Sequence, residues 1–297
     1  DVSLVGSEMC IRDRFNIPEV TKPNLLIIIG SIFFVIFTLL VGTSKMALSQ
    51  EIVFVGSFMI ILFLLFKLSN ELDANAKKML IGTAIIIFVF RAMPGVGQGG
   101  SWFEIDVLGF DQEFLSLLGL IASFLTILGI FVLRPLMEKS SMTRLIVILS
   151  IAGSFFILPS IAMFYGFHEF TSKLTNGLVD ARFIAIFNTA LESPLGQVSM
   201  IPILAWIAQS APNHLKATFF AVLASFTNLA LSASNLGTKY LNQIYVITRE
   251  VKNDLGIIKT PADYSELGIL LIIVCALTLI IPILVTYIVK KLKLLSY

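Results

Sequence analysis

The sequence predicts an all-α fold, a polytopic bundle of about eight transmembrane helices. Its mean hydropathy is +0.94, and 57% of its residues are hydrophobic while only 13% are charged. The apolar residues gather in runs, and a helix needs about 20 of them to cross a bilayer. The runs lack the strict alternation of a membrane β-barrel, so we expect helices, which satisfy their own backbone hydrogen bonds in lipid. The runs are Asn24–Gly42, Ile52–Leu68, Met79–Val96, Glu113–Leu133, Thr143–Phe164, Leu178–Gln209, Leu215–Tyr245 and Leu267–Val289.

Residues 1–14, DVSLVGSEMCIRDR, differ in character from these runs. They contain no apolar stretch like that of a signal peptide, and they resemble translated sequencing adapter. We therefore expect a non-native leader here, and we expect the true protein to begin upstream, with this chain as a C-terminal fragment. The first two runs are aliphatic and aromatic with almost no polar content, and we assign them no function.

The third run ends in a segment that should interrupt its helix. Pro94 removes a helical hydrogen bond and Gly95 permits unusual backbone angles. Arg91 precedes them by one turn, and a charge at membrane depth costs about 2.5–3.5 kcal/mol on insertion scales unless it faces a cavity or a partner. Arg91 is therefore a candidate substrate-binding residue, and the alternative is a charge paired only for packing. The glycines of residues 95–100 fit G-x-G-x-x-G, but no βαβ unit surrounds them, so we expect no dinucleotide site.

The sixth run carries a second ionisable group, Glu192. On an ideal helix Asn188 shares its face, and Gln197 lies roughly opposite unless Pro194 and Pro202 break the helix and change the register. Glu192 has no charged neighbour one turn away, so its partner must come from another helix. We take these three polar residues as candidate substrate-binding residues, and Glu192 also as the candidate for proton coupling. The alternative is a structural ion pair.

The seventh run carries one polar stripe, because its members are spaced by three or four residues. Such stripes serve as hydrogen bonds between helices, worth about 0.6 kcal/mol per contact, or as the lining of a cavity, and both interpretations stay open. Asn228 and Asn235 are the candidate substrate-binding residues. The stripe consists of Ser225, Asn228, Ser232, Asn235 and Lys239.

The charges outside the runs favour a cytoplasmic C-terminus. Lys and Arg collect in cytoplasmic segments, and their excess sets the orientation of a membrane protein. If the N-terminus is cytoplasmic, the inner segments hold many cations against the acids Glu19, Glu71, Asp73 and Glu138, whereas acids predominate on the opposite side. The inner cations are Lys22, Lys67, Lys77, Lys78, Arg134, Lys139, Arg144, Lys216, Lys290, Lys291 and Lys293.

No enzyme signature is present in the sequence. H-E-x-x-H, G-x-S-x-G and G-x-x-x-x-G-K-[ST] are all missing, and the histidines His168 and His214 lie in separate loops. Cys10 and Cys275 form neither a disulfide framework nor a zinc motif. We therefore expect no catalytic residue, metal, cofactor or nucleic-acid partner, but a small-molecule substrate and the lipid bilayer.

Three motifs resemble a known family. Leu108–Leu115, followed by a Leu-Gly pair, is similar to the "LGFS-x-EFLG" turn of the folate–biopterin transporters, which belong to the major facilitator superfamily. Glu192–Pro202 resembles the "E…GQ…MP" helix of that family, and Pro212–Asn228 resembles its "P…GT-x-FA…N" segment. The resemblance covers about Ile81–Leu241. Two departures are Lys216, where the family commonly has an acid, and Ala230, where it has glycine.

The resemblance implies that residues 79–297 form the C-terminal six-helix half of a twelve-helix transporter. Residues 15–78 would be its helices five and six, and the N-terminal half of the same chain would be a missing partner. It further implies a folate or pterin as the substrate. We therefore expect a secondary active transporter in which Arg91 and Glu192 share a central cavity and Glu192 couples transport to protons. Two alternatives remain. One is a facilitator of a sugar, amino acid or drug, and the other is a membrane scaffold or receptor in which these two charges brace each other.

Overall fold

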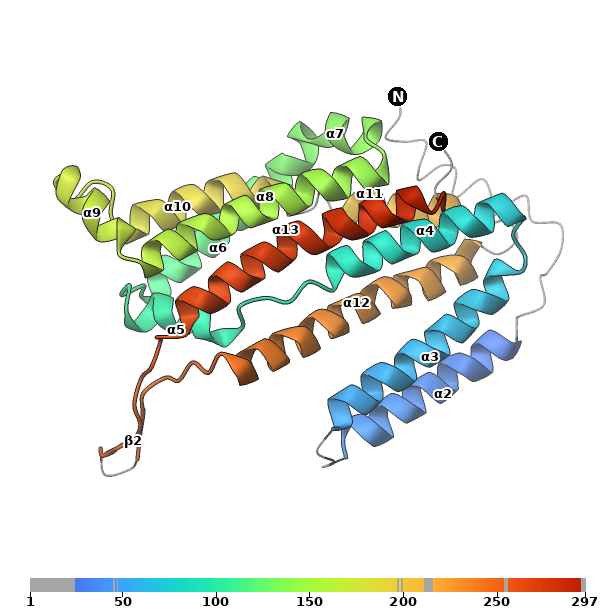
Figure 1. Cartoon of the computed structure of the whole chain (residues 1–297), viewed down its shortest axis with the longest axis horizontal. Coiled ribbons are helices and arrows are strands. Elements are labelled where there is room, and N and C mark those ends of the chain that lie inside the picture. Colours follow the sequence, from blue (N-terminus) through green and yellow to red (C-terminus); the bar gives the residue numbers. More distant parts are fainter. Residues whose placement is uncertain are drawn as a thin grey trace.

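The computed structural model describes residues 25–44, 46, 48–196, 198, 200–210, 216–253 and 256–294. The predicted leader at residues 1–14 and the candidate Gln197 lie outside these ranges. Within them the chain is an all-α bundle, as predicted, and its helices run roughly alongside one another (Figure 1).

Within the described residues every predicted run is largely helical. Two runs differ from the prediction in detail: the third ends at Arg91 rather than Val96, and the sixth is divided by a 3-10 turn. The helices are α2 (Leu25–Gly42), α3 (Ser49–Ser69), α4 (Ala74–Arg91), α5 (Gln98–Asp106), α6 (Gln112–Val132), α7 (Arg134–Lys139), α8 (Met142–Phe164), α9 (Phe167–Leu174), α10 (Ala181–Glu192), η1 (Ser193–Leu195), α11 (Met200–Ser210), α12 (Lys216–Ile244) and α13 (Leu267–Lys291), and a hairpin of β1 (Val251–Lys252) and β2 (Ile258–Thr260) joins the last two.

Five of these helices, α3, α6, α8, α12 and α13, are long and apolar enough to cross a membrane. Large apolar side chains also cover the outer surface of the bundle: Phe131 and Val132 are 72% and 73% exposed. A soluble protein rarely exposes apolar surface so extensively, whereas lipid tails solvate it. The chain is therefore an integral, multi-pass membrane protein.

The core forms where α4 meets α8, α11 and α12. Ile86 and Ile87 of α4 are fully buried against Ile146 of α8, Ile207 of α11 and Leu223 of α12. On the far side of α12, α3 and α2 pack as a pair (Figure 1). This arrangement leaves α12 between the α2–α3 pair and the rest of the bundle.

A close contact fixes α6 against the turn that divides the sixth run. Gly129 of α6 has no side chain, and a Cβ atom there would lie 2.3 Å from the carbonyl oxygen of Pro194. Thr126 Oγ1 donates a hydrogen bond of 2.9 Å to the Ser193 carbonyl, which also accepts a hydrogen bond from the Gly196 N–H within the 3-10 turn. Pro202, in contrast, does not break its helix as predicted. It is the third residue of α11, where the backbone N–H has no partner within the helix to lose.

The α4–α5 interruption lies against α12, which satisfies its backbone. Pro94 and Gly95 fall in the linker of residues 92–97, whose peptide groups cannot all bond within a helix. Non-helical backbone at membrane depth is tolerated where other groups take over these bonds. Three side chains one turn apart on α12 do so: Ser234 Oγ donates to the Met93 carbonyl (2.6 Å), Thr238 Oγ1 accepts from the Gly95 N–H (2.9 Å) and Asn242 Nδ2 donates to the Val96 carbonyl (3.1 Å).

We predict that Ser234→Ala destabilises the protein. It leaves the Met93 carbonyl without its donor, and an unsatisfied buried polar group costs about 1–3 kcal/mol. The melting temperature in detergent should fall by several degrees. The matched control is Ser123→Ala, whose hydroxyl bonds only to the Gly119 carbonyl of its own helix. Equal melting temperatures for the two variants would contradict the prediction.

Candidate transport site

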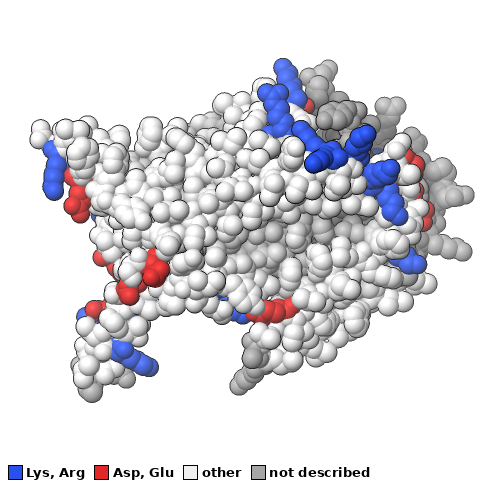
Figure 2. Space-filling model, in the orientation of Figure 1, with Lys and Arg blue, Asp and Glu red and all other residues white. Residues whose placement is uncertain are grey.

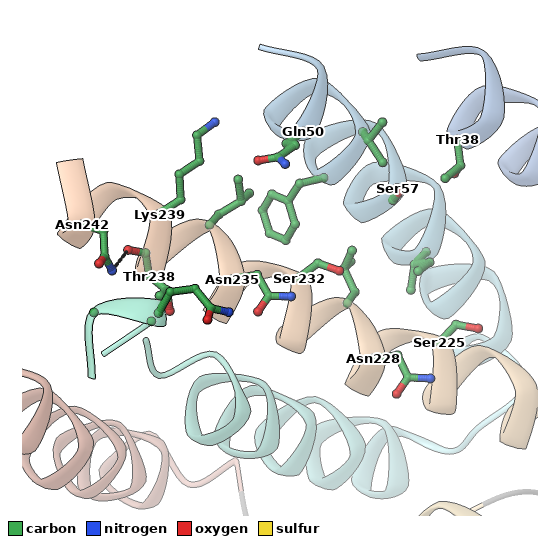
Figure 3. A pocket seen from close by; sticks show the side chains of 18 of the residues that line it. Thr38, Gln50, Ser57, Ser225, Asn228, Ser232, Asn235, Thr238, Lys239 and Asn242 are labelled. Atoms are coloured by element: carbon green, nitrogen blue, oxygen red, sulfur yellow. Dashed lines mark hydrogen bonds between the residues drawn. The ribbon is translucent and has the colours of Figure 1, made fainter. Parts of the chain in front are cut away.

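A cavity of about 1170 Å³ lies between the α2–α3 pair and α12, next to the start of α5 (Figure 3). The sequence stripe Ser225, Asn228, Ser232, Asn235 and Lys239 lies in its lining. The neighbouring side chains Ser234, Thr238 and Asn242 bond to the α4–α5 linker, and Thr238 and Asn242 also line the cavity. The polar residues of α12 thus serve both purposes that the sequence left open: the stripe lines a cavity, and the neighbouring side chains hold the α4–α5 linker.

The opposite wall comes from the two helices to which the sequence assigned no function. Thr38 of α2 and Gln50 and Ser57 of α3 face the cavity, together with apolar residues that include Phe54 (Figure 3). Gln50 and Ser57 are seven residues apart, and a seven-residue spacing returns to the same helical face. The spacing of Gln50 and Ser57 could have indicated a cavity-lining face from the sequence. The sequence analysis did not use it, because two polar residues in an otherwise apolar helix are common.

An ion pair lies at one end of the cavity. Lys239 Nζ of α12 is 2.6 Å from Glu51 Oε1 of α3, and the Tyr240 hydroxyl donates to the same oxygen at 2.9 Å. The other carboxylate oxygen, Glu51 Oε2, is buried and accepts no hydrogen bond from the described part of the chain. These contacts join two helices that are far apart in the sequence.

Arg91 and Glu192 do not share the cavity that the sequence led us to expect. Arg91 is half-buried at the end of α4, and its Nη1 donates to the Met200 sulfur of α11 at 3.0 Å. Glu192 is exposed at the end of α10, and no ion pair joins the two residues among the described ranges. Helix α4 packs mainly against α13 and α12, whereas α10 packs against α6 and α8, so the two residues belong to different parts of the bundle.

Asn188 also lies away from the cavity. It is half-buried on α10, and its Oδ1 atom is buried without a hydrogen-bond partner in the described chain. Of the six candidate substrate-binding residues, the described lining therefore contains Asn228 and Asn235, while Arg91, Asn188 and Glu192 lie elsewhere and Gln197 is outside the described ranges. No group of His, Cys, Asp and Glu side chains suited to a metal ion occurs in the residues that the structure describes.

A second polar cluster fixes the far end of α5. Asp106 accepts hydrogen bonds from Arg249 Nη2 (2.7 Å), Arg249 Nε (2.8 Å) and the Tyr264 hydroxyl (2.7 Å). Arg249 and Tyr264 flank the β1–β2 hairpin, which projects from the bundle (Figure 1). The Arg249 and Tyr264 donors hold the pKa of Asp106 below its usual value, while burial and the bond to Asp106 raise the pKa of Tyr264 to about 12. Since α5 begins at the cavity and ends here, the cluster anchors one wall of the site.

We predict that Asp106→Asn loosens the hairpin. The amide loses the charged pair with Arg249, so trypsin should cleave faster at Lys252 and Lys259. Glu250→Gln is the matched control, because Glu250 pairs only with Lys252 on the same hairpin among the described residues. Cleavage of Asp106→Asn at the control rate would contradict the prediction.

The effect should also depend on pH. A carboxylate whose pKa is lower in the folded protein stabilises the fold at pH values above its unfolded pKa of about 3.9. That contribution is lost as the pH falls through the lowered pKa. The difference in hydrogen exchange at the hairpin between wild type and Asp106→Asn should therefore be large at neutral pH and disappear in strong acid.

The comparisons with known proteins agree with this architecture. The model of the BT1 family matches residues 14–296. A folate-biopterin transporter of Synechocystis sp. (strain ATCC 27184 / PCC 6803 / Kazusa) is 21% identical over 158 residues, which are 53% of this chain and 31% of that protein. The chain thus matches about a third of the length of this curated relative. No solved structure matches the chain.

Proposed function

Because this chain belongs to the BT1 family, we propose that it works in the secondary active transport of folate- or pterin-like solutes across a membrane. The observation that carries the proposal is the cavity between the α2–α3 pair and α12, with the polar stripe of α12 along one wall. A polar hollow among lipid-facing helices is an expensive feature, and such features mark solute pathways.

The cavity suits this class of solute in size and chemistry. Ligand sites commonly measure about 300–1,000 Å³, and the volume here, about 1170 Å³, is sufficient for a pterin ring with a side chain. The amides of Asn228 and Asn235 each offer two N–H donors and one carbonyl acceptor, which match the alternating donors and acceptors on the edge of a pterin. Phe54 and Trp102 line the same cavity and provide aromatic surface against which a flat ring can stack. The printed name of the Synechocystis relative supports the same substrate class.

The charge distribution supports an orientation with the C-terminus in the cytoplasm. Lys and Arg side chains gather at the end of the bundle where α4 begins and α13 ends (Figure 2). Lys77 and Lys78 lie in the first turns of α4, and Lys290 and Lys291 lie in the last turn of α13. Such an excess of cations is typical of the cytoplasmic side.

The test is uptake of radiolabelled folate and biopterin by cells that express the protein. We predict that Asn228→Leu and Asn235→Leu each reduce uptake about tenfold or more, because the isosteric leucine leaves polar groups of the solute unpaired. Gln243→Leu makes the same chemical change on α12 outside the cavity and should keep wild-type uptake. Equal uptake by all three variants would show that the solute does not pass through this cavity. Competition experiments test the alternative substrates. If a sugar, amino acid or drug inhibits the uptake of labelled solute more strongly than unlabelled folate does, the protein transports that other solute.

Glu192 is the proposed proton-coupling residue, although it lies apart from the cavity. It is the carboxylate in the interior of the sixth run, and the described chain offers it no ion pair. Carboxylates within membrane segments commonly carry protons during a transport cycle. In this proposal Glu192 takes up and releases a proton while the solute occupies its separate site.

We predict that Glu192→Gln removes the stimulation of uptake by an inward proton gradient, because an amide cannot exchange a proton in this range. The measurement is the ratio of folate uptake with and without the gradient. Glu113→Gln, in the first turn of α6, is the matched control and should keep the wild-type ratio. A Glu192→Gln variant that is still stimulated would rule out the coupling role.

A further inference from the structure

The ion pair between Lys239 and Glu51 has features of a binding element. Lys239 is the one charged residue among the described residues that line the cavity. In Figure 3 its side chain extends from α12 toward the N-terminal end of α3, where Gln50 lies. Glu51 follows Gln50 in the chain, and its Oε1 atom receives the Lys239 ammonium at 2.6 Å.

The bonding of Glu51 is one-sided. Its Oε1 atom accepts from both Lys239 and Tyr240, while its Oε2 atom is buried and receives no donor from the described residues. A carboxylate can accept hydrogen bonds on both oxygens, and a buried acceptor without a donor is costly. The pair is therefore less stable than its short distance suggests, and α3 holds a carboxylate that another anion can replace.

Lys239 also keeps capacity for a second partner. An ammonium group has three N–H donors, and within the described chain one goes to Glu51. The Lys239 side chain is 33% exposed, compared with 18% for Glu51, so a solute in the cavity can approach the cation more easily than the resident carboxylate.

We propose that the cavity selects anionic solutes, with Lys239 binding a solute carboxylate and Glu51 occupying that position when no solute is bound. This inference rests on the proposed transport function and adds the substrate class. A solute carboxylate that reaches Lys239 forms the charge-assisted bond that Glu51 now makes. Because two carboxylates beside one ammonium repel each other, Glu51 must withdraw. Folate carries carboxylates on its tail and biopterin carries none, so the two solutes should respond differently.

A purely structural ion pair predicts another pattern. If the pair only fastens α3 to α12, removing either partner breaks the same contact. Lys239→Gln and Glu51→Gln would then weaken the binding of both solutes alike. If Lys239 binds the solute and Glu51 competes with it, the two changes have opposite effects on an anion.

The experiment measures dissociation constants of radiolabelled folate and biopterin for purified protein by equilibrium dialysis. We predict that Lys239→Gln lowers the ratio of folate affinity to biopterin affinity about tenfold or more, the usual effect of losing a hydrogen bond to a charged group. Glu51→Gln should raise that ratio, and Lys239→Arg, which keeps the charge, should restore most of it. An equal loss for both solutes in both glutamine variants would overturn the proposal.

A second pair of probes separates this inference from the proposed function. They are p-aminobenzoyl-glutamate and its uncharged diamide, which share a shape and differ in charge. Wild-type protein that binds neither folate nor biopterin would count against the proposed substrates. Anion selection would still be supported if wild-type protein binds the acid more tightly than the diamide. This preference should be lost in Lys239→Gln and increased in Glu51→Gln. A wild-type protein without the preference would refute the inference.

Discussion

The hydrogen bonds between α12 and the α4–α5 linker are the interaction on which the rest of the architecture depends. A helix that stops at Arg91 and restarts at Gln98 exposes peptide groups that lipid cannot satisfy. Ser234, Thr238 and Asn242 supply the missing partners, and they can do so only if α12 lies directly alongside the linker. The position of α12 thus follows from the interruption of α4.

The position of α12 in turn determines the site. Ser234, Thr238 and Asn242 bond to the linker, and the stripe from Ser225 to Lys239 lines the cavity beside α2 and α3. Thr238 and Asn242 lie where the two groups meet and line the cavity as well. Gly97 has a φ of 78°, a conformation suited to glycine, and lies at the cavity where α5 begins. At its other end α5 meets the Asp106 cluster, so the same short helix contacts both the hollow and the outer hairpin.

The sequence was sufficient to predict the long helices, because apolar runs and proline–glycine interruptions are local signals. The short helices α5, α7 and α9 lie outside the predicted runs. The sequence also identified the polar stripe of α12, since a repeat of three or four residues is visible within one element. The partners of these residues could not be predicted in the same way. Lys239 and Glu51 are separated by 188 positions, and no periodicity within either helix indicates that they meet. For the same reason Arg91 and Glu192 do not line the cavity that the structure describes. Each was identified from the cost of its own charge, which says nothing about which helix it faces.

The contact between Gly129 and Pro194 limits how the molecule can move. A carbonyl oxygen occupies the space of a missing side chain there, and Thr126 adds a bond one turn away. If α6 slid along α10 and η1, a bulkier residue would collide with that carbonyl, so α6 and α10 must move together. The seam between α3 and α12 differs, because it borders the cavity and is bridged at one end by the ion pair of Lys239 and Glu51.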